Sequence, residues 1–233
     1  MIAKNMFKKI LHSFGRFLSL VMIIFIGVGF YAGIRQSTPA IRDVQNRFIE
    51  SQNLMDIHLV STLGFSDNDV DALKKLDNVD MVTAGYSKYV YSGEEIIRVL
   101  TIDNDVNRFY KWEGKYPVGN DQCLADANHY KLGDTIVITE PLSDTDDEDE
   151  GDDDSGDLIV RQFTVVGTVT SPLYIGEDLG SVNLGNGELD SYILVKPDVF
   201  DMDAYTDIYI TMPKEETDTA YSDSYSEKLD SLQ

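Results

Sequence analysis

The segment FLSLVMIIFIGVGFYAGI, residues 17–34, constrains this chain more than any other feature, because eighteen consecutive residues carry no charge. As an α-helix it would be about 27 Å long, close to the hydrocarbon thickness of a bilayer. A cleaved signal peptide usually has a shorter apolar core, and a cut after Ala32 or Ala40 would follow an unfavourable sequence. A soluble core helix normally carries a polar stripe, and this segment offers only Ser19. We therefore expect a retained membrane helix over residues 17–34.

The charges on either side of this segment predict its orientation. Four basic residues precede it, and all 41 Asp and Glu residues follow residue 16. The basic residues are Lys4, Lys8, Lys9 and Arg16. Because basic residues stay on the cytoplasmic side, we expect the N-terminus inside and the acidic bulk outside. The apolar residues within 1–16 recur at helical spacing, which is typical of a short amphipathic helix on anionic lipid.

The remaining composition limits the classes of protein to consider. A formal net charge of −22 argues against binding nucleic acid, which needs a basic surface. The single cysteine, Cys123, excludes an intramolecular disulfide, and we interpret it as a small buried apolar residue. The roughly 200 residues after the apolar segment suffice for one ordinary domain or two small subdomains.

Beyond the membrane segment, Thr38 and Pro39 form a cap-and-first-turn pattern, which predicts that a stalk helix begins there. Alternation in MDIHLVS then predicts a strand with Ile57 and Leu59 on one face. On that reading His58 faces the other way and is expected to be exposed.

A β-α-β unit is expected next. Ser66 and Asp69 have the spacing of a capping box and predict a helix start. The predicted buried face comprises Val70, Leu73 and Leu76, and a strand follows from Val79. Further strands are predicted over residues 96–102, 134–139, 161–169 and 205–212, and Asn186-Gly187 predicts a tight turn. Many strands and few helices outside the membrane make an α+β extracytoplasmic domain.

An acidic segment separates the predicted strands 134–139 and 161–169. Eleven of the eighteen residues over 140–157 are Asp or Glu, and like charges at this density repel one another. A calcium loop is the specific alternative, with ligands from Asp146 to Asp157, but that motif prefers other residues at several positions and a helix on either side. We therefore expect a solvated loop.

Few residues indicate a catalytic or ligand-binding site. The histidines at 12, 58 and 129 lack metal-ligand spacing, and neither a G-x-S-x-G elbow nor a phosphate-binding loop occurs. We expect no enzyme, no catalytic or metal site, and no cofactor bound by this chain. Within the membrane segment, Gly29 and Gly33 form a small-x-x-x-small pair, which makes them candidates for close packing against another helix.

Several motifs, taken in order, resemble a known family. FKKILHSFGRFLSLVMIIFIGVGFYAGI, SDNDVDALKKLDNVDMV, WEGKYP, KLGDTIVI, FTVVGTV and SYILVKPDVF are similar to the start of FtsX-type ABC transporter permeases, in the MacB-like branch. The resemblance implies one membrane helix followed by an extracytoplasmic domain of two α+β subdomains. One subdomain would be built from the segments near both chain ends, and the other would be inserted between them.

Family members continue into a returning stalk and at least three more membrane helices, where a cytoplasmic ABC ATPase docks. This sequence stops at Gln233, about where that stalk would start, so we expect a fragment or a split subunit. The long acidic segment is a departure from the family pattern. The expected partners are the membrane, a separate ATPase that binds ATP, and the remaining permease helices or a second permease copy.

The leading hypothesis is a permease component that couples ATP-driven motion of its partners to export or signalling. The alternative is a single-pass anchored binding or adhesion protein. The predicted regions are a cytoplasmic amphipathic segment (1–16), a transmembrane helix (17–34), a stalk helix (35–53), a MacB-like extracytoplasmic core (54–213) with its acidic loop (140–157), and the start of a C-terminal stalk helix (214–233).

Overall fold

A computed structural model describes residues 14–103, 105–141, 157–176, 178–185, 187–213 and 223–230. The chain divides into two compact units, Met1–Phe48 and Ile49–Gln233. The amphipathic segment before residue 14, most of the acidic loop and Asn186 of the predicted tight turn therefore lie outside the described residues.

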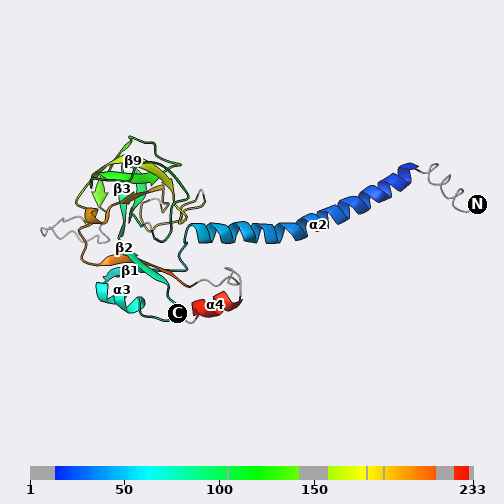
Figure 1. Ribbon diagram of the computed structural model, residues 1–233. Coiled ribbons are helices and arrows are strands. Elements are labelled where there is room, and N and C mark those ends of the chain that lie inside the picture. Colours follow the sequence, from blue (N-terminus) through cyan, green and yellow to red (C-terminus); the bar gives the residue numbers. More distant parts are fainter. Residues whose placement is uncertain are drawn as a thin grey trace, which may run out of the picture. The chain divides into compact units, whose positions relative to one another are not determined.

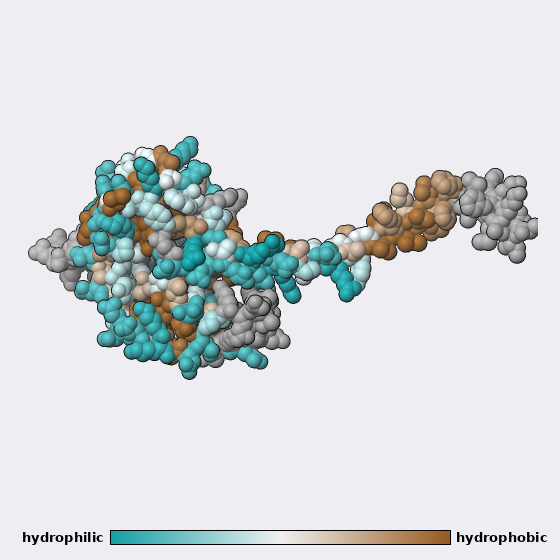
Figure 2. Space-filling view, in the orientation of Figure 1, coloured by the Kyte–Doolittle hydropathy of each residue, from teal (hydrophilic) through white to brown (hydrophobic). Residues whose placement is uncertain are grey.

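The first unit consists of most of helix α2, Phe14–Ser51, which has no buried residue. It is the one helix among the described residues that is long and apolar enough to cross a membrane, with a mean hydropathy of 2.4 over its best window. Figure 2 shows that the apolar surface covers the N-terminal part of this helix and that polar residues cover its C-terminal part. The described part of the predicted membrane segment is thus helical throughout.

The predicted helix start at Thr38-Pro39 is wrong. Pro39 lies inside α2, which runs without a break through residues 17–34 and 35–51 (Figure 1). Proline has no N–H and removes one backbone hydrogen bond, but the bonds on either side can continue the helix. The Ser37 hydroxyl also donates to the carbonyl of Ile34 at 2.8 Å one turn earlier. The expected transmembrane and stalk helices are therefore parts of one helix.

The second unit contains two sheets. The smaller, sheet A, has the order β1-β11-β2, with β1 at Ile57–Phe65, β2 at Met81–Gly85 and β11 at Tyr205–Thr211. Both outer strands are antiparallel to β11, so they run parallel to each other on either side of it. Helix α3, Asp67–Leu73, connects them. The predicted β-α-β unit is confirmed, with the last strand of the chain inserted at its centre.

Helix α3 begins where the capping box predicted. The Ser66 side chain accepts from the Asp69 N–H, and the Asp69 carboxylate accepts from the Ser66 N–H at 2.8 Å. Val70 is buried, and Leu73 packs against the apolar cluster that α3 shares with sheet A. Leu76 was also expected on the buried face, but the helix ends at Leu73 and Leu76 is 47% exposed.

The larger sheet, sheet B, is formed by the strands between β2 and β11. They are β3 (Ser87–Ser92), β4 (Glu95–Thr101), β5 (Lys111–Gly114), β6 (Gln122–Asp126), β7 (Thr135–Val137), β8 (Glu140–Pro141), β9 (Gln162–Thr170) and β10 (Ser191–Val195). Their order is β5-β9-β6-β10-β4-β3-β8, and β7 pairs with β9. The predicted pairing of the 134–139 and 161–169 segments is confirmed as the antiparallel β7–β9 pair.

The short segment Thr135–Pro141 closes sheet B into a barrel. Its first part pairs with β9, and the Ile138 N–H donates to the Arg161 carbonyl at 2.8 Å. Its second part pairs with β3, and the Thr139 N–H donates to the Tyr91 carbonyl at 3.0 Å. The two ends of the curved sheet are thus joined, and β5 remains as an additional strand on β9.

The barrel interior holds the main apolar core. Most of its buried side chains come from β3, β4, β6, β7, β9 and β10, and the others are Ile138, Leu158, Phe200 and Val199 of the short helix η1 (Pro197–Val199). Cys123 is fully buried there, as predicted, and burial raises the pKa of its thiol to about 12. Sheet A has a separate apolar cluster against α3. The second unit is therefore a mixed α+β domain of two subdomains, with sheet B inserted into sheet A (Figure 1).

Candidate functional site: the cluster between the sheets and the end of helix α2

The chain passes between the two sheets at two places. Tyr86 alone separates β2 from β3, and residues 196–204 lead from β10 to β11. The Tyr86 ring stacks on Phe200 at 5.3 Å and lies 5.1 Å from Tyr205, so that aromatic rings join the two crossings.

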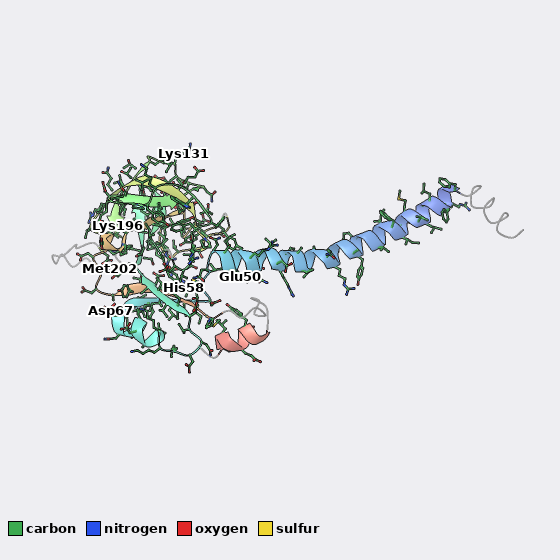
Figure 3. All side chains as sticks on the ribbon, viewed as in Figure 1. Glu50, His58, Asp67, Lys131, Lys196 and Met202 are labelled. Carbon is green, nitrogen blue, oxygen red and sulfur yellow. The ribbon has the colours of Figure 1, made fainter. Side chains whose placement is uncertain are left out.

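Charged side chains meet beside these crossings. The Asp207 carboxylate, from sheet A, is 1% exposed. On one oxygen it accepts from His58 at 2.7 Å and from Arg98 at 2.9 Å. On the other it accepts from the Ser87 and Thr206 hydroxyls, each at 2.6 Å. We call these five residues the Asp207 cluster; His58 is labelled in Figure 3.

The cluster keeps its carboxylate charged. Burial acts to raise the pKa of Asp207, but the hydrogen bond from His58, the positive charge of Arg98 and the two hydroxyls together outweigh it. The net pKa of Asp207 therefore lies below the ordinary value.

Arg98 is held from several sides. Its guanidinium donates to the Ser87 hydroxyl at 3.0 Å and to the Tyr174 hydroxyl at 3.2 Å, and it lies 5.3 Å from the centre of the Tyr89 ring. Burial acts to lower the pKa of Arg98, but Tyr174 and Asp207 raise it further, so the side chain stays charged. Its Nε is buried and has no hydrogen-bond partner.

The cluster brings together Ser, His and Asp, but its connectivity is not that of a hydrolase. In a catalytic triad the imidazole lies between the serine and the carboxylate, so that it can take the serine proton. Here the Asp207 carboxylate lies between Ser87 and His58, and Arg98 neutralises it. This arrangement orients side chains and joins two sheets; it does not generate a nucleophile.

A second constellation attaches the end of helix α2. The chain leaves α2 at Ser51, and the Gln52 and Asn53 carbonyls accept from the Arg108 and Asn107 N–H groups at 2.7 and 3.0 Å. The Asn53 amide donates to the Asp105 carbonyl at 2.7 Å. These bonds join the helix end to the loop after β4 of sheet B.

The same segment is also bonded to sheet A. The Asp56 N–H donates to the Ile210 carbonyl at 2.8 Å, and its carboxylate accepts from the Met212 N–H at 2.7 Å. The Tyr225 hydroxyl of helix α4, Asp223–Asp230, donates to the same carboxylate at 2.8 Å. The segment 52–56, which directly follows α2, is thus hydrogen-bonded to both subdomains.

The two candidate packing residues, Gly29 and Gly33, lie on α2 in the first unit. Nothing lies within 4 Å of the position that a Cβ would occupy at either one. They share a face by helical spacing, as the sequence indicates. Their role in packing stays a prediction.

The sequence reading missed the Asp207 cluster. His58 was expected to be exposed, but its side chain is only 26% exposed, pairs with Asp207 and stacks on Tyr209. One signal was available: Arg98 and Asp207 are single charges inside the apolar runs IIRVLTI and YTDIYITM. A charge within such a strand is unfavourable unless it is paired, which predicts a buried partner but not its identity.

The calcium alternative gains no support from the one proposed ligand that the structure describes. Asp157, the proposed twelfth loop position, accepts from the Lys88 ammonium on β3. The other positions lie outside the described residues. Over the described ranges, His, Cys, Asp and Glu side chains form no group of three that could hold a metal ion.

Several solved structures are similar to this chain, and two of them illustrate the match. No family model and no curated protein matches this sequence. The extracellular domain of YknZ, a noncanonic ABC-type transporter from Gram-positive bacteria, is 16% identical, with a TM-score of 0.36 over 72% of this chain and 80% of that one. The periplasmic region of MacB from Actinobacillus actinomycetemcomitans is 16% identical, with a TM-score of 0.35 over 75% of each chain. YknZ is an ABC-type transporter and MacB gives its name to the branch that the motifs resemble, but superpositions this loose carry no argument about function.

Proposed function

We propose that this chain is the N-terminal part of a membrane permease component of an FtsX/MacB-like ABC transporter. The observation that carries the proposal is the attachment of α2 through the segment 52–56, which directly follows the helix and is hydrogen-bonded to both subdomains. A displacement of this helix end acts on both sheets, because neither is connected to it through a free linker. A chain built only for anchoring would not need this double attachment.

The proposed division of roles follows from the residues present. A separate cytoplasmic ABC ATPase would bind and hydrolyse ATP, and this chain would bind no cofactor and perform no covalent chemistry. The remaining permease helices, or a second permease copy, would pack on the apolar part of α2. The extracytoplasmic domain would couple the motion of these partners to export or to signalling.

The proposed location follows from length and charge. Helix α2 would cross the membrane once in this chain, and the basic residues before residue 17 would keep the N-terminus in the cytoplasm. The acidic second unit would lie outside.

Co-purification tests the proposal. The chain, tagged at its N-terminus and expressed in its native host, is extracted from the membrane in mild detergent. We expect an ABC ATPase subunit to be recovered with it in a fixed ratio. Recovery from the membrane with no ATPase subunit, at an extraction that preserves other ABC complexes of the same cells, would contradict the proposal. That result would favour an anchored binding or adhesion protein.

A further inference from the structure

The interface between the two sheets is polar. On β11, residues 207, 209 and 211 share one face, because side chains alternate along a strand. Asp207 on this face contacts Arg98 and Ser87 of sheet B, and Tyr209 is close enough to Arg98 and to Asp103, which follows β4, for both to influence its pKa. We call this contact region the inter-sheet interface.

The apolar clusters of the two sheets meet at the crossings, where Tyr86 of the barrel cluster lies 5.1 Å from Tyr205 of the sheet A cluster. Those of the barrel contain side chains from sheet B, its connecting loops and the two crossings. The cluster of sheet A contains side chains from β1, β2, β11, α3 and their loops. In the described part of the chain, a separation that pivots about the crossings would keep this ring contact and divide no apolar cluster, and the buried Tyr209 ring is the main apolar surface that it would expose.

The interface also contains unsatisfied polar groups. Five buried side-chain atoms among the described residues lack a hydrogen-bond partner. Three of them are Arg98 Nε, Asp103 Oδ2 and Thr211 Oγ1; two belong to residues of this interface and the third shares the face of Asp207. Buried polar groups without partners destabilise the closed arrangement, and water entering between the sheets would satisfy them.

Opposing this, the Asp207 cluster stabilises the closed arrangement. The Asp207 carboxylate of sheet A accepts from the Ser87 hydroxyl and the Arg98 guanidinium of sheet B, and these bonds hold side chains of one sheet directly to side chains of the other. The two crossings, with Tyr86 stacked on Phe200, would keep the sheets attached after those contacts break. The segment 52–56, which is hydrogen-bonded to both sheets, would limit how far they open.

We propose that the two sheets separate at this interface in the native protein, and that the Asp207 cluster sets how often they do so. The open form would keep both apolar clusters intact and would pivot about the crossings at Tyr86 and residues 196–204. This inference rests on the fold and does not depend on the proposed function.

Thiol labelling of the full chain in detergent micelles tests the proposal, with three cysteines as probes. Thr211→Cys replaces a residue 1% exposed on the face of β11 that carries Asp207. Val82→Cys replaces one 8% exposed on the opposite, α3-facing side of sheet A. Native Cys123, fully buried in the barrel, reports unfolding of sheet B. The two introduced probes are placed in a Cys123→Ala background, and each rate is divided by the rate in the denatured chain.

We expect the cysteine at 211 to react at least tenfold faster than the other two at neutral pH. Adding Asp207→Asn should accelerate it at least tenfold more than it accelerates the other two, whose increase reports the loss of overall stability. Three results overturn the proposal. They are equal rates at all three probes, acceleration by the same factor at 211 and 82 that indicates unfolding of sheet A, and an unchanged rate at 211 in the Asp207→Asn variant.

Discussion

Arg98 on β4 and Asp207 on β11 lie 109 residues apart in the sequence, yet their side chains form a 2.9 Å ion pair across two different sheets. The Arg98 side chain is 13% exposed and that of Asp207 1% exposed. Both charges are therefore removed from water, and each depends on the other for compensation. This pair links two subdomains that have separate apolar cores.

Removing either partner alone should lower the stability of the fold strongly, whereas removing both should lower it by less than the sum of the two single losses. Arg98→Met or Asp207→Asn alone leaves a buried charge without its counter-ion, and we expect each to lower the free energy of unfolding by about 3–5 kcal/mol. The double variant should lose less than the sum of the two, with a coupling of about 1–3 kcal/mol. Urea titration followed by the fluorescence of Trp112, the single tryptophan, measures this. Strict additivity would show that the pair does not interact energetically.

Acid should weaken the same cluster. The folded-state pKa of Asp207 is lowered, so the unfolded chain takes up this proton first as the pH falls. The stabilisation is complete above the unfolded value, about 3.9, and is lost as the pH falls through the folded-state pKa. The difference in melting temperature between wild type and Asp207→Asn should therefore shrink from pH 6 towards pH 3. The exposed Asp198→Asn serves as the control, and a difference that is constant with pH would contradict the expectation.

The capping box at the start of α3 should contribute measurably to the stability of the fold. Ser66→Ala removes the side chain that accepts from the Asp69 N–H, and we expect a loss of about 1 kcal/mol in the free energy of unfolding. Ser66→Thr keeps a hydroxyl acceptor and should lose less. If the two variants are equally stable, the hydroxyl contributes nothing at this position.

The proposed orientation can be tested with one introduced cysteine. Val118 is 82% exposed, and native Cys123 is fully buried with a raised pKa, so the wild-type chain gives a low background. A membrane-impermeant maleimide added to intact cells should label Val118→Cys to the same extent as in lysed cells. Labelling that appears only after lysis would place the second unit in the cytoplasm.

The glycine pair in α2 should matter for association and not for insertion. Gly29→Leu with Gly33→Leu fills the face on which another helix could approach closely, and leucine favours insertion more than glycine does. We expect normal membrane yield and a clear loss of co-purifying membrane partners. Gly27→Leu, on another face of the helix, is the matched control. A double variant that retains its partners at the wild-type ratio would leave the pair without a packing role.

Local patterns predicted the local structure well. Alternation located β1, runs of strand-forming residues located β4 and β11, and the spacing of Ser66 and Asp69 located the start of α3. These signals succeed because the side-chain period and the cap are decided within a few residues. Thr38-Pro39 shows their limit, since the same dipeptide that favours a helix start is also tolerated inside a long helix.

Long-range pairings could not be predicted in the same way. His58 and Asp207 are 149 residues apart, and the expectation that His58 is exposed was wrong because alternation indicates which face a side chain occupies and not what covers that face. The closure of the barrel by Thr135–Pro141 likewise depends on two partner strands whose identity no local pattern contains. The Asp207 cluster is built from such pairings, and it was missed for that reason.

The position of β11 at the centre of sheet A determines the order in which the two sheets can fold during synthesis. Strands β1 and β2 are made early, but each pairs with β11, which the ribosome adds more than a hundred residues later. All strands of the barrel are synthesised before β11 and can close first, as a unit. Until β11 emerges, the apolar residues of β1, β2 and α3 have no sheet to pack on, and this half-made surface is the part of the nascent chain that a chaperone would need to protect.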